Sequence, residues 1–279
     1  MTTDSYYAIG KSHLVCQDVA RHGNGETPFI IICDGCSGSP QTELGAQILA
    51  QTIAAEYAKW DRWVDFWRDQ PIQARMQQIA NAALWEAVSA VDRLHLHRLA
   101  LDATLMLAHR TVHDIVVAVW GDGAIMWRLR SGKRLLRTIE FKHSAPAYLN
   151  YQVDPARATG YTQKTEDALR TISTYEDRGD GFGLIDSFED TGMEPWSLGF
   201  STDAIDLVLL ASDGLGSFQR RVDSHFEAVP ISEVADKAFG FKGMAGSFVA
   251  RRMRRFLTVE APALGWHHDD DLSVAAIHV

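Results

Sequence analysis

The stretch Phe29-Ile30-Ile31-Ile32-Cys33-Asp34-Gly35-Cys36-Ser37-Gly38 decides the fold. Its five leading apolar residues predict a short strand that is buried in the protein interior. The strand ends at Asp34 and Gly35, where glycine lets the backbone turn sharply. The same pattern returns near the end of the chain, where Ile205 to Ala211 predicts a buried strand that runs into Ser212-Asp213-Gly214. A carboxylate at the end of a buried strand is therefore a repeated feature of this sequence.

Two helices are predicted after the first of these strands. The first runs from about Pro40 to Trp67, and the second begins at Pro71. Apolar residues in the second helix recur three and four positions apart from Met76 to Leu94, which covers about five turns. One face of this helix must pack against a broad apolar surface, and a sheet is the simplest candidate.

Short β-rich runs replace the helical period from Ala103 onward. They predict two hairpins, formed by residues 105–108 with 115–120 and by residues 125–129 with 135–139. A helix pair follows between Pro230 and Leu257, and a last strand covers Leu272 to Val279. A helix pair, successive antiparallel strands and a second helix pair favour a layered α+β fold over a parallel βαβ fold.

Residues from about His143 to Ser201 differ from the rest of the chain. They are rich in Gly, Asp and Thr and have weak periodicity. A long segment with little regular structure is typical of a functional flap or lid. We therefore expect one domain over residues 1–279, with a flap at 143–201.

Composition excludes several classes of protein. The chain has 279 residues, of which 46% are hydrophobic and 23% charged, so a disordered or fibrous protein is excluded. No run of 18 apolar residues and no secretory leader is visible, which predicts a cytoplasmic protein that does not cross a membrane. The net charge of −9 argues against a nucleic-acid binder. The three cysteines, Cys16, Cys33 and Cys36, fit a reducing compartment without disulfides.

Five aspartates share a position at the end or start of a predicted strand: Asp18, Asp34, Asp122, Asp213 and Asp270. Converging carboxylates repel each other and are costly to ionise unless a cation neutralises them. Oxygen ligands select hard ions such as Mg²⁺ or Mn²⁺, and two such ions about 4 Å apart would hold a water and a phosphoryl group. The alternative is that these Asp-Gly pairs are ordinary turns, and spacing alone leaves both interpretations open.

The order of the motifs resembles the metal-dependent Ser/Thr phosphatases of the protein phosphatase 2C family. The resemblance spans the chain from about Ile9 to Val279, and Gly10-Lys11-Ser12-His13 is most similar to the bacterial branch. The matching segments are Cys16-Gln17-Asp18, Ile32-Cys33-Asp34-Gly35-Cys36-Ser37-Gly38, Ala103-Thr104-Leu105, Trp120-Gly121-Asp122, Leu210-Ala211-Ser212-Asp213-Gly214-Leu215 and Asp270-Asp271-Leu272-Ser273.

The resemblance implies a four-layer α-β-β-α sandwich, with two central antiparallel sheets flanked by helix pairs. It also implies a set of metal ligands. Asp34 would bridge two Mn²⁺ or Mg²⁺ ions, and the backbone carbonyl of Gly35 would bind one of them. The ligands that complete the second site, some of them through water, would be Asp18, Asp213 and Asp270. Asp122 would support a weaker third ion together with Asp213 and a flap carboxylate, for which the candidates are Asp154, Asp167 and Asp177.

This sequence departs from the family pattern at four places. Asp271 stands where the family often has Asn, so that Asp269, Asp270 and Asp271 all compete as the last ligand; spacing favours Asp270. Gly123-Ala124 replaces the usual Ser-Arg after Asp122. Cys36 stands where some members have a histidine that could donate a proton. No arginine precedes Gln17, so Lys11 or His13 would bind the substrate phosphate in its place.

The implied activity is hydrolysis of phosphoserine and phosphothreonine on proteins by a hydroxide that bridges the two ions, with Asp18, Asp34 and Asp213 as the catalytic carboxylates. The partner would be a phosphorylated protein, the enzyme would counter a Ser/Thr kinase, and we expect a monomer. Two alternatives within this fold stay open: a catalytically weak or inactive domain that acts as a regulatory binding module, and a phosphoesterase that acts on small molecules.

Two other motifs suggest different chemistry. Cys33-Asp34-Gly35-Cys36 has the spacing of a redox or zinc motif, but only Cys16 remains as a further thiolate ligand. His267-His268 beside three aspartates could bind a transition metal, although an exposed loop next to the site explains the pair more simply.

Overall fold

The structure is a computed structural model that describes residues 1–25, 27–60, 71–163, 168–191, 194–223 and 225–279. Two antiparallel sheets form its centre. In spatial order, the seven-stranded sheet contains β1 (Thr2–Ala8), β15 (Leu272–His278), β11 (Ile205–Ala211), β6 (Gly123–Leu129), β7 (Arg134–Phe141), β8 (Leu169–Asp177) and β9 (Phe182–Thr191). The five-stranded sheet contains β10 (Trp196–Ser201), β5 (Asp114–Trp120), β4 (Ala103–Arg110), β3 (Phe29–Gly35) and β2 (Asp18–Gly23).

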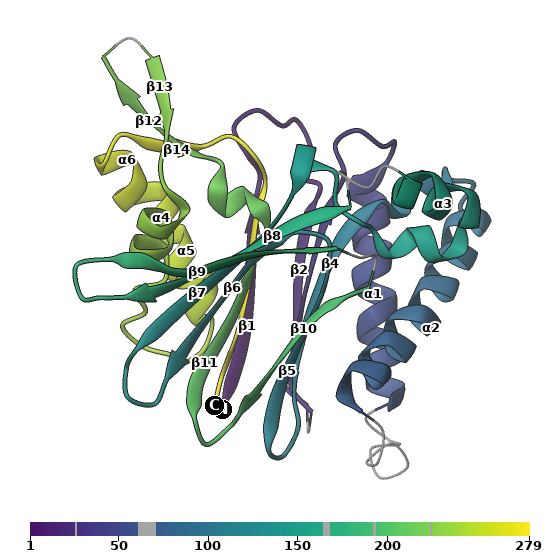
Figure 1. Cartoon of the computed structure of the whole chain (residues 1–279), viewed down its shortest axis with the longest axis horizontal. Helices are drawn as coiled ribbons and strands as arrows, with labels where there is room; N and C mark the ends of the chain where they lie inside the picture. The colour runs from purple at the N-terminus through teal and green to yellow at the C-terminus, as the bar shows by residue number, and fades with distance from the viewer. Residues whose placement is uncertain (26, 61–70, 164–167, 192–193, 224) are drawn as a thin grey trace.

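A pair of helices covers the outer face of each sheet (Figure 1). The five-stranded sheet is covered by α1 (Thr42–Trp60) and α2 (Ile72–Arg93), and the seven-stranded sheet by α4 (Ile231–Ala238) and α5 (Phe248–Arg255). Three hydrophobic cores lie between the resulting four layers. The predicted α-β-β-α sandwich is therefore confirmed.

The residues of β3 from Phe29 to Cys33 are all apolar because both faces of the strand are buried. Ile30 and Ile32 face the core between the two sheets, whereas Ile31 and Cys33 face the core under α1 and α2. Successive side chains of a strand point to opposite faces, so a strand that is buried on both faces must be apolar at every position. Burial on both sides also means that the position of Asp34, at the end of this strand, is rigidly fixed.

Smaller elements complete the chain. A three-stranded sheet is formed by β13 (His225–Ala228), β12 (Phe218–Val222) and β14 (Trp266–His268). The remaining helices are α3 (Pro155–Gln163), α6 (Ala261–Ala263), the π-helical turn η6 (Phe256–Glu260) and the 3₁₀ turns η2 (Arg98–Leu101), η3 (Lys142–Ser144), η4 (Leu149–Val153) and η5 (Asp213–Gly216). The three cysteines are free, as predicted.

The segment 143–201 is more regular than its sequence predicts. It contains α3, and its strands β8, β9 and β10 extend both central sheets, so the expectation of little regular structure is wrong. The strand β9 lies at the edge of its sheet and exposes most of its residues. Such a strand needs no apolar alternation, which removes the signal that would have predicted it.

The other predicted elements agree with the structure. Both hairpins, the strand before Asp213, the helix pair after Pro230 and the last strand are confirmed. Part of the first predicted helix, from Pro40 to Trp67, falls on residues 61–70, which lie outside the described residues. Among the described residues, no helix has the length and apolar character needed to cross a membrane.

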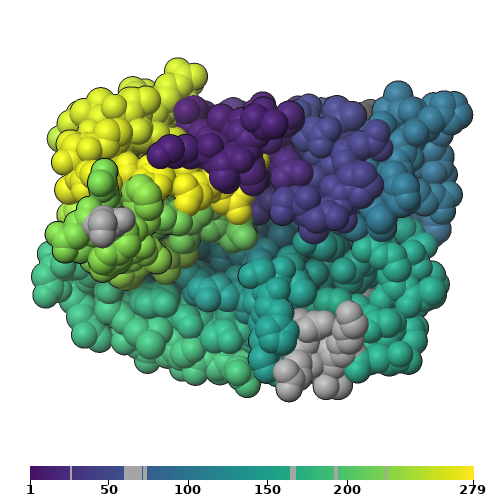
Figure 2. All heavy atoms as spheres, turned by 90° about the horizontal axis from the view of Figure 1, so that it is seen from above, coloured from purple at the N-terminus to yellow at the C-terminus, as the bar shows by residue number. Residues whose placement is uncertain are grey.

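The two ends of the chain lie side by side because β1 pairs with β15, with Thr2 opposite His278. The pairing continues beyond the strands, where the backbone N–H groups of Lys11 and Ser12 each donate to a carbonyl of the 268–269 segment at 3.1 Å. Figure 2 shows the N-terminal segment in purple against the C-terminal segment in yellow. The loop before Asp18 is thereby placed beside the acidic run at 269–271.

Candidate metal centre

Three of the predicted carboxylates meet where the two central sheets join. Asp18 begins β2 and lies opposite Asp34 of β3 in the strand register. Asp213 begins η5, directly after β11 of the other sheet. The charges of Asp18 and Asp213 both act on the buried carboxyl group of Asp34, so the three side chains lie close together. Residues that are 179 positions apart in the sequence, Asp34 and Asp213, thus share one site.

A crossing of the chain between the sheets supplies the fourth carboxylate. Asp122 lies between β5 of the five-stranded sheet and β6 of the seven-stranded sheet. Its neighbours Gly121 and Gly123 have φ angles of 105° and 131°, which residues with a side chain rarely adopt. A Cβ on Gly121 would also clash with Thr104. The two glycines therefore allow the sharp turn that points Asp122 toward the site.

Without metal, these carboxylates resist ionisation. Burial, together with the charge of Asp213, raises the pKa of Asp18 to about 7 and that of Asp122 to about 8. Burial and the charges of Asp18 and Asp213 raise the pKa of Asp34 well above its usual range. Clustered carboxylates with this behaviour favour the binding of a cation, which would offset both the repulsion and the desolvation.

The donor set fits a hard divalent ion. One carboxylate oxygen of Asp18, Oδ2, accepts a hydrogen bond from Ser212 Oγ at 2.7 Å, whereas Oδ1 is buried without a hydrogen-bond partner. Oxygen-only ligands suit Mg²⁺ or Mn²⁺. Among the residues that the structure describes, no three Asp, Glu, His or Cys side chains are placed to hold one ion by themselves. A backbone carbonyl and water would therefore have to complete the coordination of each ion.

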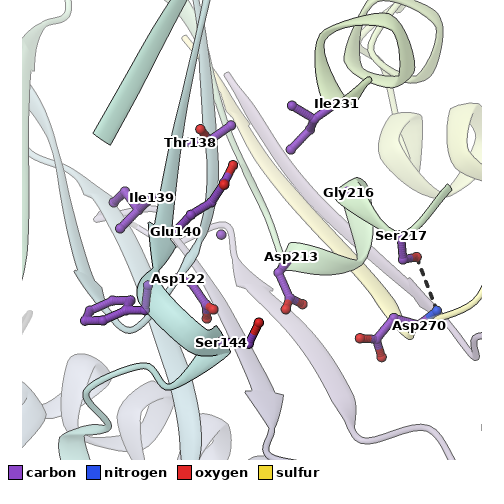
Figure 3. A pocket seen from close by; sticks show the side chains of 12 residues that line it. Asp122, Thr138, Ile139, Glu140, Ser144, Asp213, Gly216, Ser217, Ile231 and Asp270 are labelled. Carbon is purple, nitrogen blue, oxygen red and sulfur yellow. Dashed lines mark hydrogen bonds between the residues drawn. The ribbon is translucent and has the colours of Figure 1, made fainter. Parts of the chain in front are cut away.

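A hollow of about 480 Å³ opens beside the carboxylates (Figure 3). Asp122, Ser144, Asp213 and Asp270 gather at one end of it, while Thr138, Glu140 and Ile231 lie at the other. Glu140 and Ser144 line the site but were not predicted from the sequence. Glu140 lies just after the predicted strand 135–139 and Ser144 at the start of the predicted flap, and neither belongs to a recognised motif.

The structure separates the three consecutive aspartates near the C-terminus. Asp270 lines the hollow. Asp271 is 1% exposed, and its carboxylate accepts hydrogen bonds from the backbone N–H groups of Gly10 at 2.7 Å and Gln17 at 2.5 Å. Asp269 Oδ1 lies 3.4 Å from His267 Nε2. Asp271 thus holds the loop before Asp18 in place through hydrogen bonds. Asp270 is the one of the three aspartates that faces the hollow.

Glycines on two sides hold the 269–271 backbone in place. A Cβ on Gly214 would collide with the carbonyl oxygen of Asp271, and a Cβ on Gly10 would collide with that of Asp269. Both collisions are with backbone atoms, which cannot rotate away. Only glycine therefore allows the acidic run to approach η5 and the N-terminal loop so closely.

Gly214→Ala is expected to lower the melting temperature by about 5 to 10 °C and to weaken metal binding, because the new methyl group displaces Asp271 and with it Asp270. Differential scanning calorimetry and a Mn²⁺ titration measure the two effects. The matched control is Gly160→Ala in α3, where a Cβ meets no atom within 4 Å and stability should hold or rise slightly. Equal melting temperatures for the two variants would contradict this packing argument.

The two residues predicted to bind substrate phosphate differ in position. His13 Nδ1 lies 3.1 Å from Asp271 Oδ2, and its Nε2 lies 3.6 Å from Asp270 Oδ1. Burial alone would lower the pKa of His13, but the hydrogen bond and charge of Asp271, aided by the charges of Asp270 and Asp18, raise it. Lys11 is exposed and does not line the hollow. His13 is therefore placed beside the site, and Lys11 lies at the surface.

The predicted flap carboxylates do not reach the hollow in the described residues. Asp154 accepts a hydrogen bond from the N–H of Arg157 at the start of α3, at 3.1 Å. Asp177 pairs with Arg134 at 2.8 Å. Asp167 lies outside the described residues. In the flap segment, the oxygen found at the hollow is that of Ser144.

In the Cys-x-x-Cys and His-His motifs, Cys33 is buried in a core and both histidines pack against aromatic rings. Cys33 is buried under α1 and α2, where desolvation raises the pKa of its thiol, whereas Cys36 lies in the loop beyond the strand and is partly exposed. His267 packs edge-on against Phe226 with ring centroids 4.9 Å apart, and His268 stacks on Phe218 at 5.4 Å. Within the described part of the chain, neither motif forms a metal site.

Comparison with known proteins decides which family carries this arrangement. The family model described as Protein phosphatase 2C matches residues 9–245. The chain belongs to the protein phosphatase 2C family. The match covers most of the chain and includes Asp18, Asp34, Asp122 and Asp213. A search of curated proteins finds no match.

Solved structures of bacterial phosphatases share the fold of this protein phosphatase 2C member. A bacterial serine phosphatase matches with a TM-score of 0.56 and 12% identity, over 100% of this chain and 98% of that one. Stp1 from Staphylococcus aureus, a serine/threonine phosphatase, matches at 0.52 and 13% identity, over 99% and 94%. The catalytic domain of PstP, solved with two manganese ions, matches at 0.51 and 16% identity, over 99% and 96%.

Proposed function

We propose that this protein phosphatase 2C member is a metal-dependent protein phosphatase that hydrolyses phosphoserine and phosphothreonine. The observation that carries the proposal is the meeting of Asp18, Asp34 and Asp213 at the junction of the two sheets, with one oxygen of Asp18 buried and unpartnered. Membership of the family supports it. The manganese-bound structure of PstP supports the choice of ion, Mn²⁺ or Mg²⁺.

Each carboxylate has a proposed role. Asp34 would bridge two ions, aided by the carbonyl of Gly35, and Asp18, Asp213 and Asp270 would complete the second position together with water. When bound, the two ions would lower the pKa of a bridging water and neutralise the phosphoryl oxygens. Asp122 and Asp213 would hold a weaker third ion. Ser144, which lies at the same end of the hollow as Asp122 and Asp213, is the described candidate to complete that third position.

The shape of the hollow favours a substrate larger than phosphate. Its acidic end, near Asp213, would hold the ions and the phosphoryl group, whereas Thr138, Glu140 and Ile231 lie at the far end. A peptide that carries the phosphorylated residue would extend over these side chains. We therefore favour a phosphorylated protein, the product of a Ser/Thr kinase, over a small phosphoester, and we expect the enzyme to act as a cytoplasmic monomer of one domain.

The test is an assay of p-nitrophenyl phosphate and a phosphothreonine peptide, with Mn²⁺ or with EDTA. We expect turnover of both substrates only with metal, and a higher kcat/KM for the peptide. Calorimetric titration on the same preparation counts the bound ions. Two bound ions without turnover would favour a regulatory binding module instead. Turnover of p-nitrophenyl phosphate but not of the peptide would favour an enzyme of small molecules.

A further inference from the structure

A second buried carboxylate network lies next to the proposed metal centre. Its centre is Asp102, which directly precedes β4 and is 1% exposed. The carboxylate accepts hydrogen bonds from Ser39 Oγ at 2.8 Å and from Asn150 Nδ2 at 2.9 Å. Arg157 of α3 binds it with both terminal nitrogens, at 2.9 and 3.0 Å. A buried carboxylate with four donors is fully satisfied, so it has no capacity left for a metal ion.

One side of Asp102 holds the loop that follows Asp34. The backbone carbonyl of Asp102 accepts a hydrogen bond from the N–H of Cys36 at 2.9 Å, and its side chain binds Ser39. The N–H of Ser39 in turn donates to the carbonyl of Cys36 at 3.1 Å. This loop begins one residue after Gly35, whose carbonyl is a proposed metal ligand. Asp102 thus holds this loop in place through two hydrogen bonds, one to its backbone carbonyl and one to its carboxylate.

The other side of Asp102 holds the segment that borders the hollow. The guanidinium of Arg157 lies over the ring of Tyr151, 4.7 Å from its centroid. Asn150 is 3% exposed and also donates to the carbonyl of Arg98 at 3.2 Å. Upstream, the ring of Tyr148 packs edge-on against Tyr151 with centroids 5.7 Å apart, and Ser144 lines the hollow itself. The segment 144–157 therefore runs from the site to the bidentate ion pair.

We infer that Arg157 is a positioning residue, which through Asp102 holds the segment 144–157 against the loop after Asp34 and so shapes the site around Ser144, where the peptide residues on one side of the phosphorylated residue would lie. The inference rests on the proposed phosphatase function. A bidentate Arg–carboxylate pair fixes both distance and orientation, which a lysine cannot do to the same extent. Asp34 itself is held by the pairing of β3 with β2 and β4, and its position does not depend on the ion pair between Arg157 and Asp102.

Loss of Arg157 therefore affects large and small substrates differently. In Arg157→Gln, the KM for a phosphothreonine peptide is expected to rise about tenfold, because the segment 144–157 is no longer fixed. The kcat/KM for p-nitrophenyl phosphate, which needs little beyond the metal centre, should fall by less than about threefold. Arg157→Lys keeps a positive charge opposite Asp102, so it should fold even if the glutamine variant does not, and its KM for the peptide should rise by about threefold.

A second bidentate pair in the same chain gives a matched control. Arg128 binds Asp206 through two hydrogen bonds of 2.8 and 3.0 Å, and its side chain is 24% exposed, compared with 29% for Arg157. It lies five residues along β6 from Gly123, about 17 Å from the site end of that strand. Arg128→Gln loses a bidentate Arg–carboxylate pair whose carboxylate is 27% exposed, compared with 2% for Asp102, and should leave both substrates unaffected.

The experiment measures steady-state kinetics of these variants and the wild type on both substrates at saturating Mn²⁺, with ion binding followed by calorimetry. A selective rise of KM for the peptide in the Arg157 variants, with two ions still bound, supports the inference. Equal losses on both substrates, or the same result in Arg128→Gln, overturn it and leave Arg157 with a purely structural role. A wild type that turns over neither substrate overturns the proposed function, and the inference fails with it.

Discussion

Asp34→Asn is expected to lower kcat/KM for p-nitrophenyl phosphate by at least about 10³-fold, with little change in the fold. Asparagine keeps the shape of the side chain but removes the charge that two ions would share. Asp34 lies opposite Asp18 in the strand register and is close enough to Asp213 for its charge to raise the Asp34 pKa, so no neighbouring carboxylate can take over its central position. The loss should therefore appear in kcat and in the affinity for the second ion together.

Calorimetric titration with Mn²⁺ and an activity assay measure the two effects on the same preparation. The control is Asp203→Asn, in the exposed turn between β10 and β11, which should retain full activity. Asp213→Asn should be nearly as inactive as Asp34→Asn. An Asp34→Asn variant that keeps metal-dependent turnover would remove Asp34 from the mechanism and refute the proposed roles.

The predictions from the sequence were most successful where burial imposes a pattern. The short β-branched run before Asp34 and Gly35 predicts a buried strand, and the three-and-four spacing between Met76 and Leu94 predicts a helix with one buried face, as the structure confirms. The order of these elements predicted a layered α+β fold, and the resemblance to the family implied its four layers. The edge strand β9 exposes most of its residues, with only Phe182 packed against a core, so its sequence carried no alternation to recognise.

The candidate site was predictable only as a set of residue types. Asp18, Asp34, Asp122, Asp213 and Asp270 were recognised through Asp-Gly turns and motif order, and the structure brings all five to the same junction. Which aspartate of the acidic run faces the site was not settled by the sequence. That choice depends on the direction of one backbone segment, which Gly10 and Gly214 fix by close approach across the fold.

Residues that act through long-range contacts gave no signal in the sequence. Asp102 and Arg157 are 55 positions apart and belong to no recognised motif, and only the packing of α3 brings them together. Glu140 reaches the hollow because β7 happens to end there. Such juxtapositions depend on tertiary structure, and single-sequence patterns describe only local structure.

Removing metal is expected to make the stability of the protein fall as the pH rises. Burial holds the pKa of Asp18 at about 7 and that of Asp122 at about 8, whereas both carboxyls in the unfolded chain titrate near 3.8. Between about pH 4 and pH 8, the folded protein without metal therefore binds more protons than the unfolded chain, so its free energy of unfolding decreases as these protons are lost.

Added Mn²⁺ should oppose this loss, because it binds the ionised carboxylates of the folded protein. The difference in melting temperature between Mn²⁺ and EDTA is expected to grow from near zero at about pH 4.5 to about 10 °C at pH 7.5. Burial lowers the pKa of His109 to about 4, which costs stability below pH 6.5 in both buffers, so this contribution cancels in the difference.

The Asp34→Asn variant tests whether repulsion between the buried carboxylates, and no other effect of pH, lowers the stability of the metal-free protein. In EDTA at pH 7.5, the variant removes one of the mutually repelling carboxylates and should melt at a higher temperature than the wild type, although it is inactive. With Mn²⁺ the order should reverse, because the wild type gains the stabilisation by metal that the variant lacks. A variant that is less stable than the wild type in both buffers would mean that the carboxylates are held by hydrogen bonds alone, and the proposed metal centre would lose its physical basis.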